Sequence, residues 1–258
     1  MLTPIKTIIS FCFLFLCITA QANEALDLLE RSNLATKQLS YNGVFTFQRE
    51  GDLQSIRIIH RADEQGVIER LISANGVERE FIPKQYDLVT CIYPEGSGLQ
   101  ASRKPLGHGF PSDLLDRMKV ASPYYQLVLG QQGRIAAHPA QELLMQPIDQ
   151  YRYGYRLWIE KDTALLLQAD LINEKGKILE KFAFSSVDLS SNIADYLLQP
   201  QMEGNMMSWN RKDKETKVNK AVQQASKWQV TWMPEGFKLT GHQNRFARNG
   251  SPLDLTCL

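Results

Sequence analysis

Histidine and cysteine are scarce in this sequence, and neither occurs at the spacings that metal sites use. The 258 residues contain four of each. The histidines form no H-E-x-x-H or H-x₃-H pattern; they are His60, His108, His138 and His242. No C-x-x-C pair occurs, so neither a zinc ribbon nor a redox-active dithiol is supported. The sequence therefore predicts no metal centre, and His60, within a strand-like run, is interpreted as a structural histidine.

Catalytic motifs are missing as well. The Gly-Ser-Gly at residues 96–98 lacks the strand–turn–helix context of a nucleophile elbow. The Gly-His-Gly at residues 107–109 lacks the third glycine and the preceding strand of a dinucleotide site. Glu69, Glu78 and Glu80 can approach one another across a hairpin, but such charges are common on exposed strand faces. We therefore expect no catalytic residues and no cofactor, and the sequence argues against an enzyme.

A strong charge of either sign is absent. Lys and Arg number 29 against 28 Asp and Glu, which gives a formal net charge of +1. A nucleic-acid-binding protein usually carries a clear basic excess, so we expect no nucleic-acid partner. After the N-terminal segment, no apolar run reaches the roughly 20 residues that a membrane-spanning helix needs. We therefore expect the rest of the chain to be peripheral to a membrane at most.

The start of the chain has the composition of an export signal. Lys6 precedes the apolar run Ile8–Ile18, which is too short to span a bilayer. Ala20 and Ala22 place small residues where a signal peptidase requires them. We expect residues 1–22 to be a signal peptide that is cleaved after Ala22.

Export would remove Cys12 and Cys17 with the signal peptide and leave Cys91 and Cys257. Disulfides persist in the compartments that exported proteins reach. A bridge between the two remaining cysteines would close most of the chain into one loop, which is an unusual arrangement. We favour a lone buried Cys91, with a bridge to Cys257 as the alternative.

A change of apolar period marks the first structured elements. From Glu24 to Gln38, small and apolar residues recur at i, i+3, i+4, i+7 and i+10, the pattern of an amphipathic helix. Asn23 is suited to cap this helix. From Tyr41 onward the period is 2, which is typical of half-buried strands. A helix of this length is marginal alone in water, so we expect its apolar stripe to pack on the sheet.

Two sets of predicted strands follow, separated by a glycine-rich loop at residues 94–111. The strands are Gly43–Phe47, Ser55–Arg61, Val67–Ser73, Val77–Ile82, Leu88–Tyr93, Tyr124–Leu129, Gly133–Met145, Tyr151–Ile159, Leu165–Ile172 and Ile178–Phe184. Their spacing of about 10 to 12 residues favours an antiparallel meander over βαβ units. A short helix is predicted at Asp113–Lys119, capped by Ser112. The predicted fold class is therefore mainly β, of the α+β type.

The strand pattern fades toward the C-terminus. Residues 205–220 are polar and rich in lysine, so we expect a linker at 191–226 after a β domain at 23–190. A strand that runs into a Pro/Gly turn is predicted at Trp228–Phe237. Because few residues follow it, we expect 227–258 to be the start of an incomplete, small C-terminal β domain.

Aromatic and aliphatic residues gather on the predicted strand faces. We select these as the candidate lining of an apolar cavity: Tyr41, Phe45, Phe47, Ile56, Ile58, Tyr125 and Trp158. On a curved sheet such faces line either a packed core or an apolar cavity. The selection depends on strand alternation, and a register error of one residue would reverse it.

Short motifs in order along residues 24–240 resemble the RseB/MucB family. The opening strands are matched by LSYNG at 39–43, IHR at 59–61, ERL at 69–71 and NGVERE at 75–80. The middle is matched by SPYY at 122–125, GRIA at 133–136 and DQYRYGYRLWI at 149–159. The end of the N-terminal domain is matched by LEKF at 179–182, and the start of the C-terminal domain by WMPEGF at 232–237.

The resemblance implies a periplasmic regulator of the extracytoplasmic stress sigma factor, sigma-E. Family members bind the periplasmic domain of the membrane-spanning anti-sigma factor RseA (MucA) and protect it from proteolysis. Their N-terminal domain is similar to the half-open β-barrel of lipoprotein carriers such as LolA, and it is thought to sense lipid or lipopolysaccharide. We therefore expect a half-open antiparallel β-barrel with helices over its concave face.

The family's C-terminal domain supplies much of the anti-sigma contact. By this resemblance, the candidate partner-binding residues are Trp228, Trp232, Pro234 and Phe237. We expect the family's later C-terminal strands to have no counterpart in this sequence. An alternative function is a periplasmic carrier of lipids or lipoproteins, which would use the same interior without a protein partner. The Trp228–Phe237 segment argues against it, because a simple carrier needs no second domain.

Overall fold

The computed structural model describes residues 23–64, 66–75, 80–84, 88–93, 111–189, 192–210, 230–237, 245–246 and 252–253. The chain divides into two compact units, residues 1–209 and residues 210–258. The expected signal peptide, most of the glycine-rich loop and Cys257 lie outside the described residues.

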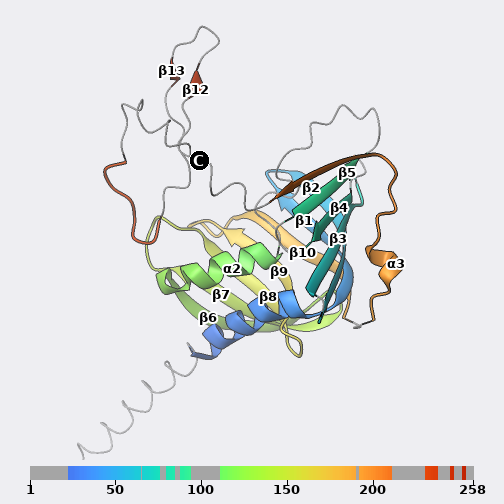
Figure 1. Cartoon of the computed structure of the whole chain (residues 1–258). Coiled ribbons are helices and arrows are strands. Elements are labelled where there is room, and N and C mark those ends of the chain that lie inside the picture. The colour runs from blue at the N-terminus through green and yellow to red at the C-terminus, as the bar shows by residue number, and fades with distance from the viewer. Residues whose placement is uncertain are drawn as a thin grey trace, which may run out of the picture. The chain divides into compact units, whose positions relative to one another are not determined.

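The first unit is built on one sheet of eleven strands. In chain order these are β1 (Tyr41–Arg49), β2 (Asp52–Asp63), β3 (Gly66–Ser73), β4 (Glu80–Lys84), β5 (Leu88–Tyr93), β6 (Tyr125–Ile135), β7 (His138–Pro147), β8 (Gly154–Glu160), β9 (Leu166–Ile172), β10 (Ile178–Asp188) and β11 (Asn205–Asn210). In space the order is β11-β5-β4-β3-β2-β1-β10-β9-β8-β7-β6, so β6 and β11 form the two edges. Every strand pair with a described register is antiparallel. The sheet is strongly curved and does not close, which confirms the predicted half-open barrel (Figure 1).

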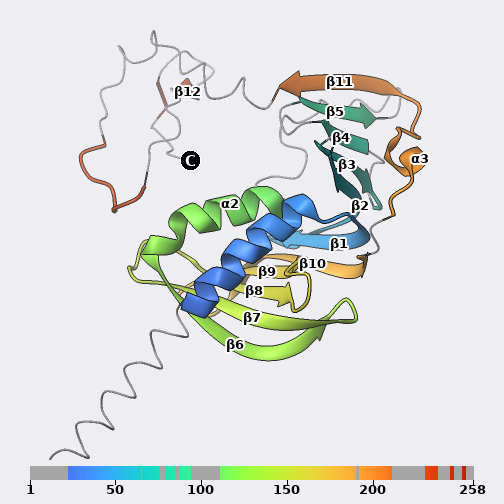
Figure 2. The same ribbon diagram turned by 60° about the horizontal axis from the view of Figure 1, so that its bottom comes forward.

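Two of the described helices lie across the concave face of this sheet. They are the N-terminal helix, residues 23–38, and α2 (Pro111–Ala121), which a 3₁₀ turn, η1 (Ser122–Tyr124), joins to β6 (Figures 1 and 2). The predicted stripe of the N-terminal helix is buried: Ala25, Leu28, Leu29, Ser32 and Ala35. Its apolar members share one core with Leu115 and Met118 of α2 and with strand residues. Removing this apolar surface from water is what holds the helix in place.

A smaller apolar cluster lies on the opposite face of the sheet, where α3 (Asp195–Leu198) packs. Ile59 is fully buried there against Ile193 and Leu198. Its chain neighbour Ile58 belongs to the concave core, as expected from the alternation of a strand. β2 is therefore covered on both faces.

Two arginines of the sheet hold α3 in place. Arg61 forms an ion pair with Asp195, and the Arg70 guanidinium donates a hydrogen bond of 2.9 Å to the Leu197 carbonyl. The sequence predicts a linker at 191–226, whereas the structure places both α3 and β11 within this range. α3 has only four residues and β11 only six, so neither is long enough to show a clear period.

Two predicted strands differ most clearly from the structure. One strand is predicted at Gly133–Met145, but β6 and β7 meet there in a tight turn at Ala136 and Ala137. Both alanines have positive φ, 48° and 69°. Such turns usually contain Gly or Asn, so this one carries no recognisable signal. The strand predicted to begin at Tyr151 begins at Gly154 instead.

The second unit is described in three short segments. Residues 230–237 contain a turn in which the Phe237 N–H donates to the Pro234 carbonyl at 3.1 Å, as the Pro/Gly pattern predicts. Residues 230–232 do not form part of a strand, in contrast to the prediction. β12 (Arg245–Phe246) and β13 (Pro252–Leu253) form a two-stranded sheet.

Within the residues that the structure describes, no helix has both the length and the apolar character needed to cross a membrane.

Candidate functional site

The candidate cavity residues fall into a packed group and a half-buried group. Tyr41, Phe45, Ile56 and Ile58 are all exposed by 3% or less and belong to the concave core. The Phe45 ring packs on the Phe182 ring with centroids 5.0 Å apart. These positions are therefore filled by side chains and stabilise the half-barrel by apolar burial.

The other three candidates, Phe47, Tyr125 and Trp158, are half-buried. Phe47 is in register with Phe182 of β10. Phe182 pairs with Ala169 of β9, and Ala169 pairs with Leu157 of β8. Leu157 is therefore on the concave face with Phe47. Its neighbour Trp158 is on the opposite face, and this placement differs from the shared lining that we predicted.

His60 connects the sheet to the end of the N-terminal helix. Its imidazole stacks on the Tyr41 ring with centroids 4.7 Å apart, and Nδ1 lies 2.8 Å from the Leu39 carbonyl oxygen. Burial lowers the pKa of His60 to about 4, although the hydrogen bond to Leu39 acts in the opposite direction. The neutral imidazole is thus part of the folded structure, in keeping with the structural role predicted for it.

A polar clasp joins the two helices above the concave core. Asp116 of α2 accepts hydrogen bonds from the Asn33 amide at 3.0 Å and the Lys37 ammonium at 2.5 Å. Partial burial raises the pKa of Asp116, but the bonds from Lys37 and Asn33 outweigh it and leave this pKa below its ordinary value. The clasp is largely exposed, so it orients the helices more than it stabilises them.

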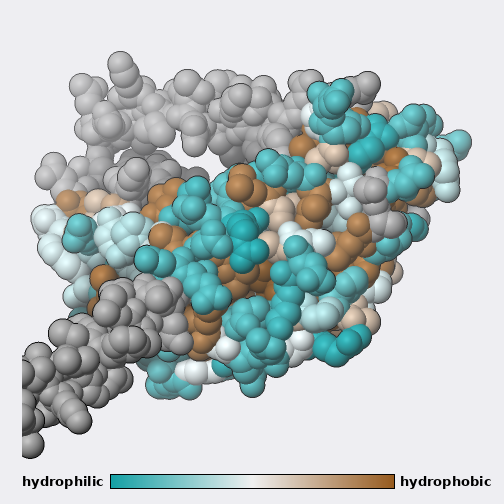
Figure 3. All heavy atoms as spheres, turned by 90° about the horizontal axis from the view of Figure 1, so that it is seen from below, coloured by the Kyte–Doolittle hydropathy of each residue, from teal (hydrophilic) through white to brown (hydrophobic). Residues whose placement is uncertain are grey.

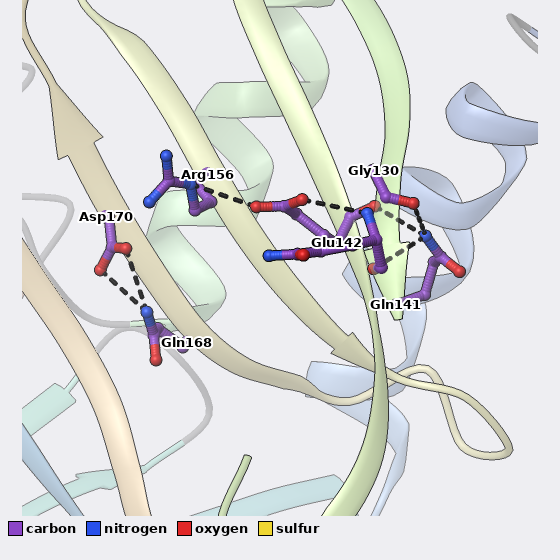
Figure 4. Close-up of polar contacts among 7 residues, drawn as sticks. Gly130, Gln141, Glu142, Arg156, Gln168 and Asp170 are labelled. Atoms are coloured by element: carbon purple, nitrogen blue, oxygen red, sulfur yellow. Dashed lines mark hydrogen bonds and ion pairs between the residues drawn. The ribbon is translucent and has the colours of Figure 1, made fainter. Parts of the chain in front are cut away.

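A polar network occupies the outer face of β7, β8 and β9 (Figure 4). The Glu142 carboxylate lies 3.2 Å from the Arg156 guanidinium. The Asp170 carboxylate accepts from the Gln168 amide at 3.0 and 3.2 Å. Burial raises the pKa of Asp170, and the Gln168 bond offsets this only in part. Sequence reasoning missed this network, since single polar residues on alternate strand positions resemble an ordinary solvated face.

The same network supports a bulge in β6. The Glu142 carboxylate accepts a hydrogen bond of 3.1 Å from the Gln131 backbone N–H, and the Gln141 side-chain amide donates to the Gly130 carbonyl at 2.9 Å (Figure 4). A Cβ atom at Gly130 would collide with the Glu142 carboxylate. The glycine therefore allows Glu142 to reach the bulge.

An exposed apolar surface lies in the β7–β8 loop. Ile148, Tyr151 and Tyr153 are 67%, 48% and 51% exposed. The Tyr125 hydroxyl donates to the Tyr153 carbonyl at 2.9 Å, and the Arg152 guanidinium lies 4.3 Å from the centre of the Tyr124 ring. These contacts hold the loop in one conformation. Exposed tyrosines in a fixed loop are typical of binding surfaces.

Apolar residues also reach the surface elsewhere. In the view from below, they emerge in separate patches between hydrophilic residues (Figure 3). In the second unit, Trp232 and Phe237 are 63% and 43% exposed, and Pro234 is half-buried. Trp228 lies outside the described residues. The assignment of this segment to partner binding stays a prediction.

The described residues contain no group of three or more His, Cys, Asp or Glu side chains that could hold a metal ion. The fold and the surfaces above define a half-open β-barrel protein with a helix-filled interior, an edge strand that no other described strand covers, and an aromatic loop. The chain belongs to the MucB/RseB family, because the family model described as MucB/RseB N-terminal domain matches residues 24–202.

Named relatives agree with this assignment. The sigma factor AlgU regulatory protein MucB of Pseudomonas aeruginosa is 33% identical over 221 residues, which are 85% of this chain and 66% of MucB. The sigma-E factor regulatory protein RseB of Haemophilus influenzae is 24% identical over 251 residues, covering 95% of this chain and 76% of RseB. The chain thus spans just under two thirds of the length of MucB.

A solved structure of the complex of Pseudomonas aeruginosa MucA and MucB is also similar. The match has a TM-score of 0.64 and 29% sequence identity, and it covers 89% of this chain and 74% of the matched chain. A crystal structure of MucB in complex with MucA(peri) matches with a TM-score of 0.62 over 87% of this chain.

Proposed function

We propose that this protein regulates an envelope-stress sigma factor by binding the periplasmic domain of its anti-sigma factor, the counterpart of RseA or MucA. The observation that carries the proposal is the similarity of 89% of the chain to the MucB–MucA complex structure. Binding of this kind hides the cleavable segment of the partner from proteases by mass action. The site of action is the periplasm, reached by means of the signal peptide at residues 1–22.

A lipid such as lipopolysaccharide is the proposed releasing signal. Because the concave core is filled at Tyr41 and Ile58, an acyl chain enters only if the N-terminal helix or α2 moves. Two features ease that movement. The clasp at Asp116 is mostly exposed. The Ser32 hydroxyl is buried in the helix–sheet interface without a hydrogen-bond partner among the described residues, which costs about 1–3 kcal/mol. A lipid releases the partner only if it binds the partner-free form more tightly.

A carrier of lipids or lipoproteins is the second candidate. It would use the same half-barrel, but it needs an interior that accepts cargo repeatedly. The packed positions at Phe45 and Ile56 leave no standing cavity there, which favours the regulator.

Calorimetry with the purified protein tests the proposal. The cognate anti-sigma periplasmic domain is titrated into the protein with and without lipopolysaccharide. We expect micromolar or tighter binding that lipopolysaccharide weakens. Absence of binding by a folded protein would refute the regulator, and uptake of lipid without any effect on partner binding would favour the carrier.

A further inference from the structure

The β6 strand presents an open edge. Within the described part of the chain, no strand pairs with its outer side. Its inner side pairs with β7, from Tyr125 opposite Pro147 to Leu129 opposite Leu143. In an antiparallel ladder, alternate backbone groups of an edge strand point away from the sheet. Such an unpaired row is a template for another strand.

A bulge limits the length of this template. The register of β6 breaks after Leu129. Beyond it, the Gly130 carbonyl and the Gln131 N–H are bound by the side chains of Gln141 and Glu142. These backbone groups are no longer available to an added strand. The template is therefore residues 125–129, about 17 Å long at 3.4 Å per residue.

The side chains of the template are suited to an apolar neighbour. Leu127 and Leu129 are half-buried and pack against the edge of the concave core, so part of each remains open to a neighbour. Val128 is half-buried on the other face, and Gln126 is exposed. The template contains no proline and no charged residue, although edge strands commonly carry proline or lysine to prevent pairing.

The β7–β8 loop anchors the start of the template. The Ile148 N–H donates to the Tyr124 carbonyl at 3.2 Å, immediately before β6. Tyr153 is tied to Tyr125 by the hydroxyl–carbonyl bond described above. Both contacts therefore come from the β7 side of β6, opposite the open edge, and they fix the start of the template in place.

We propose that β6 is a strand-addition site, at which an extended, uncharged segment of the anti-sigma partner pairs with residues 125–129. The inference rests on the proposed function, which supplies the partner. Backbone hydrogen bonds give affinity in this mode of recognition, and alternate side chains give specificity. Here the specificity comes from apolar side chains that extend the concave core beyond Leu127 and Leu129.

The size of the edge favours an extended segment over a second copy of this chain. A stable dimer buries about 800 Å² on each partner. Two curved sheets that meet along about 17 Å of edge bury much less. An extended segment pairs with the outward backbone groups and contacts side chains on both faces of the edge, so it uses the whole template.

Hydrogen exchange on the complete protein tests the site without any substitution. The amides of residues 125–129 that point outward exchange quickly in the free protein. We expect the cognate anti-sigma periplasmic domain to slow them by on the order of tenfold or more. The amides of β9, which has a neighbour on both sides, serve as the internal reference.

A matched pair of substitutions provides the second readout. Gln126 and Gln131 are both exposed on β6, one within the template and one in the bulge. Gln126→Lys places a charge in the added ladder, so we expect about threefold to fivefold weaker partner binding. Gln131→Lys adds the same charge outside the template and should change affinity by less than about twofold.

The outcomes separate this inference from the proposed function. Protection of residues 125–129 together with a selective effect of Gln126→Lys supports the site. Partner binding without that protection overturns the site and leaves the regulator standing. Absence of partner binding overturns both. Dimers in sedimentation that Gln126→Lys dissociates would show that a second copy occupies the edge, and they would also overturn the proposal.

Discussion

The centre of the sheet and its β6 edge use the same antiparallel pairing but differ in how they are covered. In the centre, Tyr41, Phe45 and Ile58 lie beneath the helices, and Ile59 lies beneath the α3 segment, all at 2% exposure or less. At the edge, Leu127 keeps contact with the core but stays half-exposed. The centre therefore supplies stability, and the edge retains the unpaired groups that binding can use. The following predictions test this division.

The largest effect is expected when a side chain is removed from the centre. Ile58→Ala should lower the free energy of unfolding by about 2–5 kcal/mol, because it leaves a cavity in a packed core. Val128→Ala, which removes a half-buried side chain at the edge, should cost less than about 1 kcal/mol. Urea unfolding of the two variants measures both values. Similar losses would contradict the division between centre and edge.

Acid should weaken the centre through His60. Its pKa is about 4 in the folded protein against an ordinary value of 6.5. The unfolded chain therefore takes up this proton more readily, so the stabilisation is complete above pH 6.5 and is lost as the pH falls toward 4. The full contribution of His60 to the free energy of unfolding is about 3 kcal/mol. Urea unfolding between neutral pH and pH 4 should show this fall, and His60→Gln should show a smaller one.

Crowding of the β6 strand should have an intermediate cost. A Cβ atom at Gly133 would lie 2.7 Å from the Trp158 ring. Gly133→Ala should thus destabilise the protein by about 1–3 kcal/mol, since the half-buried Trp158 ring already packs over this position. Adding Trp158→Leu should recover part of that loss, because the two residues are in contact. If the losses of stability of the two single variants simply add up in the double variant, measured by thermal unfolding, the Trp158 ring is not the cause of the destabilisation.

The smallest effect is expected at the clasp between the helices. Asp116→Asn removes an exposed ion pair with Lys37 and should lower the free energy of unfolding by about 1 kcal/mol or less. Asp27→Asn, which removes an exposed pair with Arg31 within one helix, is the control. If the clasp gates lipid entry, Asp116→Asn alone should speed lipid uptake, measured with a fluorescent fatty acid. Equal uptake by both variants would rule out that role.

The sequence was informative wherever a period ran for several turns or residues. The N-terminal helix and most strands follow directly from alternation, and the half-open barrel follows from the family motifs. The Ala136–Ala137 turn was missed because alanine seldom has positive φ, and nothing in the residue type signals it. α3 and β11 were missed because they are stabilised by distant partners, such as Arg61 and Arg70, and not by local propensity.

The surfaces were harder to predict than the core. Tyr41, Phe45, Ile56 and Ile58, which we selected as candidate cavity lining, lie buried in the concave core. Trp158 lies on the face opposite Leu157, so the candidate lining combined residues from both faces of the sheet. The edge position of β6 is a property of the complete strand order, which depends on the long-range pairing of β1 with β10.

The place of β11 has a mechanical consequence. This strand ends at Asn210, where the second unit begins, and among the described strands β5 alone pairs with it. Tension on the chain beyond residue 210 therefore loads the β11–β5 bonds before any other part of the sheet. Force across the strand breaks these bonds one at a time, whereas force along the strand loads them together. The β11–β5 pairing is thus the first part of the half-barrel to meet force from the following segment, and the centre is the last.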